Sequence, residues 1–105
     1  MSNFYLLFAT DKPDVLSLRE QLRASHRAYL NDPAPHAVRV ILGGPTLTQD
    51  SRQMNGTLLV IQAQTLEEVD AFLAEDPYMK SGVFASFEVR PWNWSRGLSI
   101  CELTI

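Results

Sequence analysis

Residues 74–83, which read AEDPYMKSGV, decide the fold, because they close one helix, make a tight turn and lead into a strand. Pro77 disfavours helical geometry at Asp76, and Gly82 permits a turn before the strand begins. The same stretch places the carboxylate of Asp76 at the junction between helix and strand. An Asp before a Pro is also a common helix stop, so this residue has a purely structural interpretation as well.

Outward from this stretch, the sequence predicts a helix before it, from about residue 65 to residue 75, and a strand after it, over residues 83–90. Thr65 and Glu68 have the spacing of a capping box, which marks the start of the helix. Residues 56–63, just before this helix, are apolar on both faces and predict another strand. The apolar stripe of the helix consists of Leu66, Val69, Phe72 and Leu73.

The N-terminal part begins with residues 3–9, an apolar and aromatic segment that predicts a strand with apolar side chains on both faces. Asp11 is a candidate cap and Pro13 suits a first turn, which predicts a helix from about residue 11 to about Leu30. His26 lies on the core-facing stripe of this helix. The other members of the stripe are Val15, Leu18, Leu22 and Tyr29.

Between the two predicted helices, residues 36–42 predict a strand that ends at Gly43-Gly44-Pro45. The mostly polar residues from Pro45 to Asn55 predict a loop, long enough to form a lid or a binding edge. At the other end of the chain, residues 98–105 alternate loosely and predict a fifth strand or a C-terminal arm.

The predicted order of strand, helix, strand, strand, helix and strand is the βαββαβ pattern of ferredoxin-like α+β folds, in which an antiparallel sheet carries both helices on one face. Strands that are apolar on both sides need a second cover, which a second copy of the chain would supply. We therefore expect residues 1–105 to form a single domain that pairs into a homodimer, a dimeric α+β barrel, with further assembly left open.

Composition excludes several classes of function. The formal net charge is −3 with no cluster of Lys and Arg, so we expect no nucleic-acid partner. No apolar run approaches the roughly 18 residues of a membrane span, and no signal peptide is recognised, so we expect no membrane association and a cytoplasmic location. The single cysteine, Cys101, cannot form an internal disulfide, which is compatible with a reducing compartment.

Four segments resemble the YciI-like (YCII-related) family of small α+β proteins. They are the first strand with Asp11-Lys12-Pro13, the motif Arg23-Ala24-Ser25-His26, the turn Gly43-Gly44-Pro45-Thr46-Leu47, and Asp76-Pro77-Tyr78 with the closing strand as far as Arg90-Pro91. Their order and spacing cover most of residues 3–92. The chain departs from the family pattern at Ser25 and at Arg27, which follows His26 where an apolar residue is common.

The resemblance implies a ferredoxin-like fold, dimers of the α+β barrel type, and a histidine and an aspartate acting as an acid–base pair. Carried over to this sequence, the pair is His26 and Asp76. A dehydrochlorinase of chlorinated hydroxyquinols is the best-defined enzyme of the family, and muconolactone isomerase is similar in fold. The resemblance therefore implies an elimination or isomerisation of a small molecule.

The residues themselves support this chemistry without requiring it. A neutral imidazole can take a proton from a substrate, and a carboxylate on its far nitrogen fixes the tautomer. Asp76 is the candidate carboxylate, because the end of the second helix and the middle of the first can face the same pocket. The alternative interpretation of His26 is a packed side chain that hydrogen-bonds to a backbone carbonyl.

The candidate substrate-binding residues are Arg23, Gly44, Pro45 and Tyr78, each with a structural alternative. Arg23 lies one turn before His26 and can hold an anion, or it can form a surface ion pair with Glu20. Gly44 and Pro45 allow a ligand to approach the backbone or simply make a turn. Tyr78 lines the pocket with its hydroxyl or packs by its ring.

We expect neither a metal site nor a cofactor. The two histidines, His26 and His36, lack the close spacing of zinc ligands, and we place His36 at the surface. The sequence thus leaves three hypotheses: a cofactor-independent lyase or isomerase that uses His26 and Asp76, a non-catalytic metabolite-binding or regulatory module, and a domain whose pocket has lost its activity.

Overall fold

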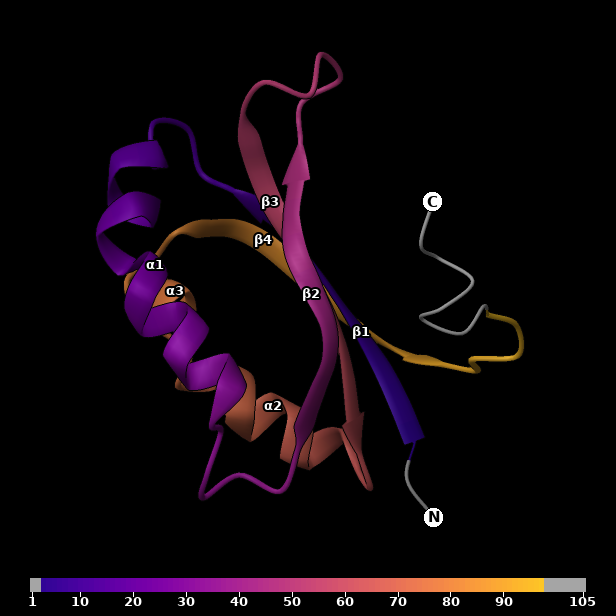
Figure 1. The fold of residues 1–105 in the computed structure, drawn as a ribbon. Helices are drawn as coiled ribbons and strands as arrows, with labels where there is room; N and C mark the ends of the chain where they lie inside the picture. Colours follow the sequence, from indigo (N-terminus) through magenta and orange to yellow (C-terminus); the bar gives the residue numbers. More distant parts are fainter. Residues whose placement is uncertain (1–2, 98–105) are drawn as a thin grey trace.

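A computed structural model describes residues 3–97, which form a four-stranded antiparallel sheet with three helices on one of its faces (Figure 1). The strand order is β2-β3-β1-β4, so β2 and β4 are the edge strands. The predicted ferredoxin-like βαββαβ architecture is confirmed. The predicted fifth strand or arm, together with Cys101, lies outside the described residues. The elements are β1 (Asn3–Asp11), α1 (Leu16–Asn31), β2 (Arg39–Leu47), β3 (Met54–Ala63), α2 (Leu66–Ala74), α3 (Pro77–Lys80) and β4 (Phe84–Trp92).

The hydrophobic core lies between the sheet and the helices. Alternate residues of the two central strands face it, such as Leu7 of β1 and Leu59 and Ile61 of β3, all at most 1% exposed. From α2, Val69 and Phe72 pack onto the same layer and are fully buried. Because neighbouring side chains of a strand point to opposite faces, this alternation fixes which strand residues face α1.

The start of the first helix differs from the prediction. Asp11 ends β1 and does not cap a helix, Asp14 has a φ of 61°, and α1 begins only at Leu16 without a side-chain cap. The reason is that the carboxylate of Asp11 binds Arg19, with 2.7 Å between Oδ2 and Nε. It is therefore engaged by a side chain one turn inside the helix and does not reach the first helical N–H groups.

The second strand also differs, because β2 continues through Gly43-Gly44-Pro45 as far as Leu47. Likewise β4 contains Pro91 and reaches Trp92, two residues past the predicted end. Both prolines lie in edge strands, where a residue without an N–H is tolerated. The predicted loop is correspondingly shorter, since β3 already begins at Met54.

The junction that decides the fold contains an additional short helix. The predicted capping box of Thr65 and Glu68 is confirmed, and α2 ends at Ala74 as expected. Asp76 then caps α3, a single helical turn at a place where the sequence predicts only a tight turn. An N-cap Asp followed by Pro in the first helical turn is a helix-start signal that identifies such a turn. Gly82 has a φ of 74°, consistent with its predicted role in the turn.

The sheet face away from the helices carries exposed apolar side chains. Phe8 is 51% exposed and Leu42 55%, and Leu58, which pairs with Phe8 across the β1–β3 ladder, is 38% exposed. These side chains lie on the same face because Leu42 pairs with Val60, two residues from Leu58. No helix within residues 3–97 has the length and hydropathy needed to cross a bilayer.

Candidate functional site

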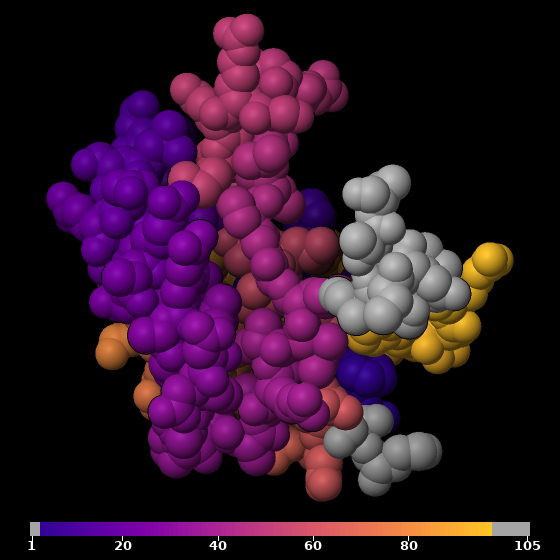
Figure 2. Space-filling view, viewed as in Figure 1, coloured from indigo at the N-terminus to yellow at the C-terminus, as the bar shows by residue number. Residues whose placement is uncertain are grey.

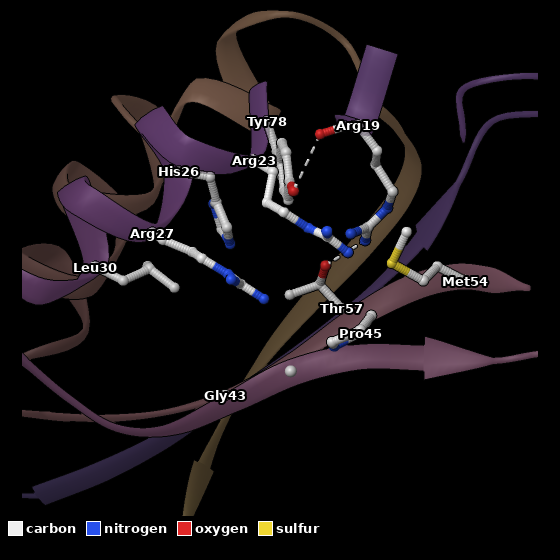
Figure 3. A pocket seen from close by; sticks show the side chains of 11 residues that line it. Arg19, Arg23, His26, Arg27, Leu30, Gly43, Pro45, Met54, Thr57 and Tyr78 are labelled. Atoms are coloured by element: carbon white, nitrogen blue, oxygen red, sulfur yellow. Dashed lines mark hydrogen bonds between the residues drawn. The ribbon is translucent and has the colours of Figure 1, made fainter. Parts of the chain in front are cut away.

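The candidate site is a cavity of about 150 Å³ between α1 and the strands β2 and β3. In Figure 2 the surface is hollowed where α1 in purple meets β2 in magenta, and Figure 3 shows the side chains that point into this space. The cavity is lined by Arg19, Arg23, His26, Arg27, Leu30, Gly43, Gly44, Pro45, Met54, Thr57 and Tyr78. The predicted binding residues Arg23, Gly44, Pro45 and Tyr78 are all among them.

His26 and Asp76 are in direct contact, with 2.6 Å between Nδ1 and Oδ1. His26 is 7% exposed and Asp76 is fully buried. Because a carboxylate oxygen only accepts, we assign the proton to Nδ1, which donates to Asp76. The other ring nitrogen then carries a lone pair, and the imidazole ring points into the cavity (Figure 3). The contact joins residues 50 positions apart in the sequence.

The local structure explains why Asp76 is fixed. It is the N-cap of α3, and its Oδ1 also accepts from the backbone N–H of Tyr78 at 3.4 Å. Pro77 holds Asp76 in extended geometry before the helix, with a φ of −62° and a ψ of 132°. Oδ2, the second carboxylate oxygen, is buried without a hydrogen-bond partner among the described residues. Within the described part of the chain, Oδ1 therefore accepts all the side-chain hydrogen bonds of Asp76.

Tyr78 serves the site with both its ring and its hydroxyl. The ring stacks on the imidazole of His26, with 3.9 Å between centroids and 15° between planes. The hydroxyl donates to the backbone carbonyl of Arg19 at 3.5 Å, a contact drawn as a dashed line in Figure 3. Burial raises the pKa of the Tyr78 phenol, although the positive charges of Arg19 and Arg23 act in the opposite direction. The phenol therefore stays protonated at neutral pH and acts as a donor.

Arg19 is a site residue that sequence reasoning missed. It is 3% exposed, and its guanidinium lies over the Tyr78 ring, 4.8 Å from the centroid. Its Nε and Nη2 bind Asp11, and Nη2 also donates to the carbonyl of Gly56 at 2.6 Å and to the hydroxyl of Thr57 at 2.5 Å. Arg19 precedes His26 by seven residues, and this spacing places both on the same helix face. This spacing is the feature of the sequence from which Arg19 could have been identified as a site residue.

Arg23 shows both of its predicted alternatives, since it lines the cavity and also lies 3.6 Å from the Glu20 carboxylate. Arg27, noted in the sequence only as a departure from the family pattern, lines the cavity as well. Gly44 and Pro45 contribute from within β2 and not from a turn. Sequence reasoning did not identify Thr57, which is buried in β3.

The second histidine, His36, is more enclosed than predicted. Its side chain is 14% exposed, packs edge-on against Phe72 and Tyr29, and lies 3.6 Å from the carboxylate of Glu75. It does not line the cavity that contains His26. Across residues 3–97, no group of three or more His, Cys, Asp and Glu side chains is arranged to hold a metal ion.

Residues 3–93 match the model of the YCII-related domain. The protein YciI of Escherichia coli is 29% identical over 93 residues, covering 84% of this chain and 94% of that protein. Fusaric acid biosynthesis protein 2 of Gibberella fujikuroi is 33% identical over 95 residues, covering 84% of this chain and 88% of that protein.

A similar solved structure is that of 5-chloro-2-hydroxyhydroquinone dehydrochlorinase from Burkholderia phenoliruptrix, in complex with 2,5-dihydroxybenzoquinone. It is 33% identical with a TM-score of 0.72, and the match covers 86% of this chain and 93% of that chain.

Proposed function

Because the chain belongs to the family of YCII-related domain proteins, we propose that it is a proton-transfer enzyme with His26 as general base and acid. Asp76 orients the imidazole and fixes its tautomer. The proposal rests on the 2.6 Å contact between His26 Nδ1 and Asp76 Oδ1, which leaves the second ring nitrogen free on the cavity side. A general base must lie within hydrogen-bond reach of the proton that it takes, and the cavity provides space for a substrate there.

The reaction would begin when the free ring nitrogen of His26 takes a proton from a C–H or O–H of the substrate. The electron pair left behind moves into the substrate. In an elimination it expels a leaving group as an anion, and His26 then releases its proton to water; in an isomerisation His26 returns the proton at another carbon. Asp76 stabilises the imidazolium that forms in between, as a buried carboxylate does in hydrolytic triads. All these groups are side chains of this chain, so the scheme requires no cofactor.

The likeness to the dehydrochlorinase supports the elimination. That enzyme is 33% identical over a match covering 86% of this chain, and its structure contains a six-membered cyclic quinone. A cavity of about 150 Å³ has the volume of an engineered protein cavity that binds benzene. We therefore propose a small cyclic molecule as substrate.

We also propose that the protein works as a homodimer, with the exposed apolar sheet face as the interface. Phe8, Leu42 and Leu58 lie together on this face and are each at least 38% exposed. A contiguous apolar patch of this kind marks an interaction surface. A two-fold pair of sheets would cover the patch with its own copy.

The test is an assay with 5-chloro-2-hydroxyhydroquinone and a panel of cyclic lactones and quinols, with and without a carboxylate on the ring, following chloride release and exchange of C–H for C–D in heavy water. We expect turnover by the wild type and a fall of about 10²- to 10⁴-fold in His26→Ala. Ser25→Ala is the matched control, because Ser25 is exposed and adjacent on α1. Unchanged turnover in His26→Ala would rule out the proposed role.

The same panel separates catalysis from plain binding. A compound that raises the melting temperature and is recovered unchanged, without exchange of any proton, would favour a metabolite-binding module. A compound that is converted by the wild type, and only bound by His26→Ala, would support the enzyme.

A further inference from the structure

We propose that the substrate of this cavity is a small ring that carries a carboxylate, and that Arg23 and Arg27 bind this carboxylate. The inference rests on the proposed function, because it names the class of substrate for the same site. It begins from the charge of the cavity wall. Three arginines line the cavity, and no Asp or Glu is among the lining residues within the described chain.

The three arginines are not equivalent. Arg19 is neutralised by the buried carboxylate of Asp11 at 2.7 Å. Arg23 has one ion pair, with Glu20 at 3.6 Å, in which both side chains are well exposed. Arg27 forms no ion pair within residues 3–97. The uncompensated positive charge of the wall therefore comes mainly from Arg23 and Arg27.

These two side chains are placed to act together. They are four residues apart on α1, so they lie on the same face one turn apart, where like charges repel. Figure 3 shows both guanidinium ends extending from α1 into the space in front of β2 and β3, toward which the His26 ring also points. An anion between them would relieve their repulsion and would lie beside the imidazole.

The rest of the lining selects the kind of anion. A guanidinium matches the planar geometry of a carboxylate and can bind both of its oxygens. Leu30, Pro45 and Met54 line the cavity with apolar surface, which suits a ring better than a fully polar ion such as phosphate. A volume of about 150 Å³ accommodates one six-membered ring. Together these features describe a cyclic carboxylate.

The experiment is an NMR titration of the full chain with benzoate, with benzamide as the neutral analogue and inorganic phosphate as a competitor. Benzoate should bind with shifts at His26 and Tyr78, about tenfold or more tightly than benzamide, because hydrogen bonds to charged groups are the stronger ones. Arg23→Gln and Arg27→Gln should each weaken benzoate binding about tenfold. Arg52→Gln is the control, since it removes the same charge from the exposed turn after β2 and should leave binding unchanged.

Equal affinity for benzoate and benzamide, binding of neither, or full displacement by equimolar phosphate would overturn the inference. An equal loss in Arg52→Gln would do the same, because it would indicate a general effect of net charge. His26→Gln distinguishes a failure of the proposed acid–base role from a failure of the proposed carboxylate site. If it retains benzoate binding and loses turnover, both proposals stand; if it retains turnover, the acid–base role fails while the carboxylate site stands.

Discussion

The imidazole of His26 and the phenol ring of Tyr78 are stacked, with their centroids 3.9 Å apart and their planes inclined by 15°. The carboxylate that binds His26 belongs to Asp76, the cap of the short helix that carries Tyr78. One turn of helix thus provides both the charge at the edge of the imidazole and the surface against its face. This arrangement fixes the ring in two directions and leaves its remaining edge for a ligand.

We predict that Asp76→Asn keeps the tautomer of His26 and loses most of the activity. Oδ1 accepts from two N–H groups, of His26 and of Tyr78, so an amide oxygen should occupy the same position. The NH₂ group then replaces Oδ2, where the described residues provide no acceptor. We expect turnover to fall by at least about 10²-fold, because the carboxylate charge is lost, and stability by roughly 1–3 kcal/mol, because a buried donor is unsatisfied.

The ¹⁵N shifts of the imidazole measure the tautomer directly. A proton on Nδ1 in both proteins agrees with the prediction. If the proton instead lies on the other ring nitrogen in the variant, the new amide donates to His26. The hydrogen bond from the Tyr78 N–H would then not control the orientation of that amide. Asp76→Ala serves as the comparison, because it removes the acceptor altogether.

The sequence predicts the topology because the topology depends on local signals, whereas the family resemblance supplies the pairing of His26 with Asp76. Apolar periodicity and the capping box locate the second helix, and the stripe on the first helix places His26 toward the core. The order of the elements then brings the first helix close to the junction at Asp76. These signals place each residue on its own element but leave open a backbone partner for His26 and a plain helix stop at Asp76, so only the packed structure shows the contact between them.

Arg19 was missed for a physical reason. A buried arginine is stable only when its charge and donors are satisfied, and its partners here are Asp11, Gly56 and Thr57. Two of these are 37 and 38 residues away in the sequence. Such a network exists only after β1, β3 and α1 have packed together. The continuation of β2 through Pro45 was missed similarly, since only the sheet order shows that β2 is an edge strand.

Breaking the Arg19–Asp11 pair should destabilise the protein strongly. Arg19→Met leaves the Asp11 carboxylate, whose side chain is 5% exposed, without a counter-charge. A buried pair broken on one side costs about 3–5 kcal/mol, and removing the partner as well, in Arg19→Met with Asp11→Leu, should recover part of this. Urea unfolding measures both. The exposed pair of Arg23 and Glu20 on α1 is the control, and Glu20→Gln should change stability by no more than about 1 kcal/mol.

Two glycines near the cavity should respond very differently to alanine. A Cβ on Gly56 would lie 2.2 Å from the carbonyl oxygen of Ala9 and 2.5 Å from the hydroxyl of Thr46, so the strands would have to move. We expect Gly56→Ala to cost about 1–3 kcal/mol or more, as for overpacked cores. A Cβ on Gly44 meets nothing within 4 Å, and Gly44→Ala should change stability by about 0.5 kcal/mol or less. Similar midpoints of denaturation for the two variants would contradict this.

Tyr29 should make the protein sensitive to alkali. Its hydroxyl donates to the carbonyl of Phe72 at 2.6 Å, and burial, aided by the charges of Glu75 and Asp76, raises its pKa from 10.0 to about 12. Between these two values the unfolded chain loses the phenol proton while the folded chain keeps it. The stabilisation from this shift is therefore complete below pH 10 and is lost as the pH rises through about 12.

Denaturant midpoints from pH 9 to pH 11.5 test this in the wild type and in Tyr29→Phe. The variant is expected to be less stable at pH 9 by about 1 kcal/mol, because it lacks the hydrogen bond. Its stability should then fall less steeply with pH, because it lacks the titrating group. Parallel curves for the two proteins would show that Tyr29 does not contribute to the alkaline loss.

The proposed dimer can be tested with two phenylalanines of nearly equal exposure on opposite faces of the sheet. Phe8 is 51% exposed on the face away from the helices, and Phe87 is 52% exposed. Phe87 pairs with Ala9, whose side chain faces the helix side, so Phe87 lies on that side too.

Phe8→Glu would bury a charge in the proposed interface, whereas Phe87→Glu adds the same charge elsewhere. Analytical ultracentrifugation should therefore find a dimer for the wild type and for Phe87→Glu, and a monomer for Phe8→Glu. A wild type that sediments as a monomer, or dissociation of both variants alike, would exclude this face as the interface.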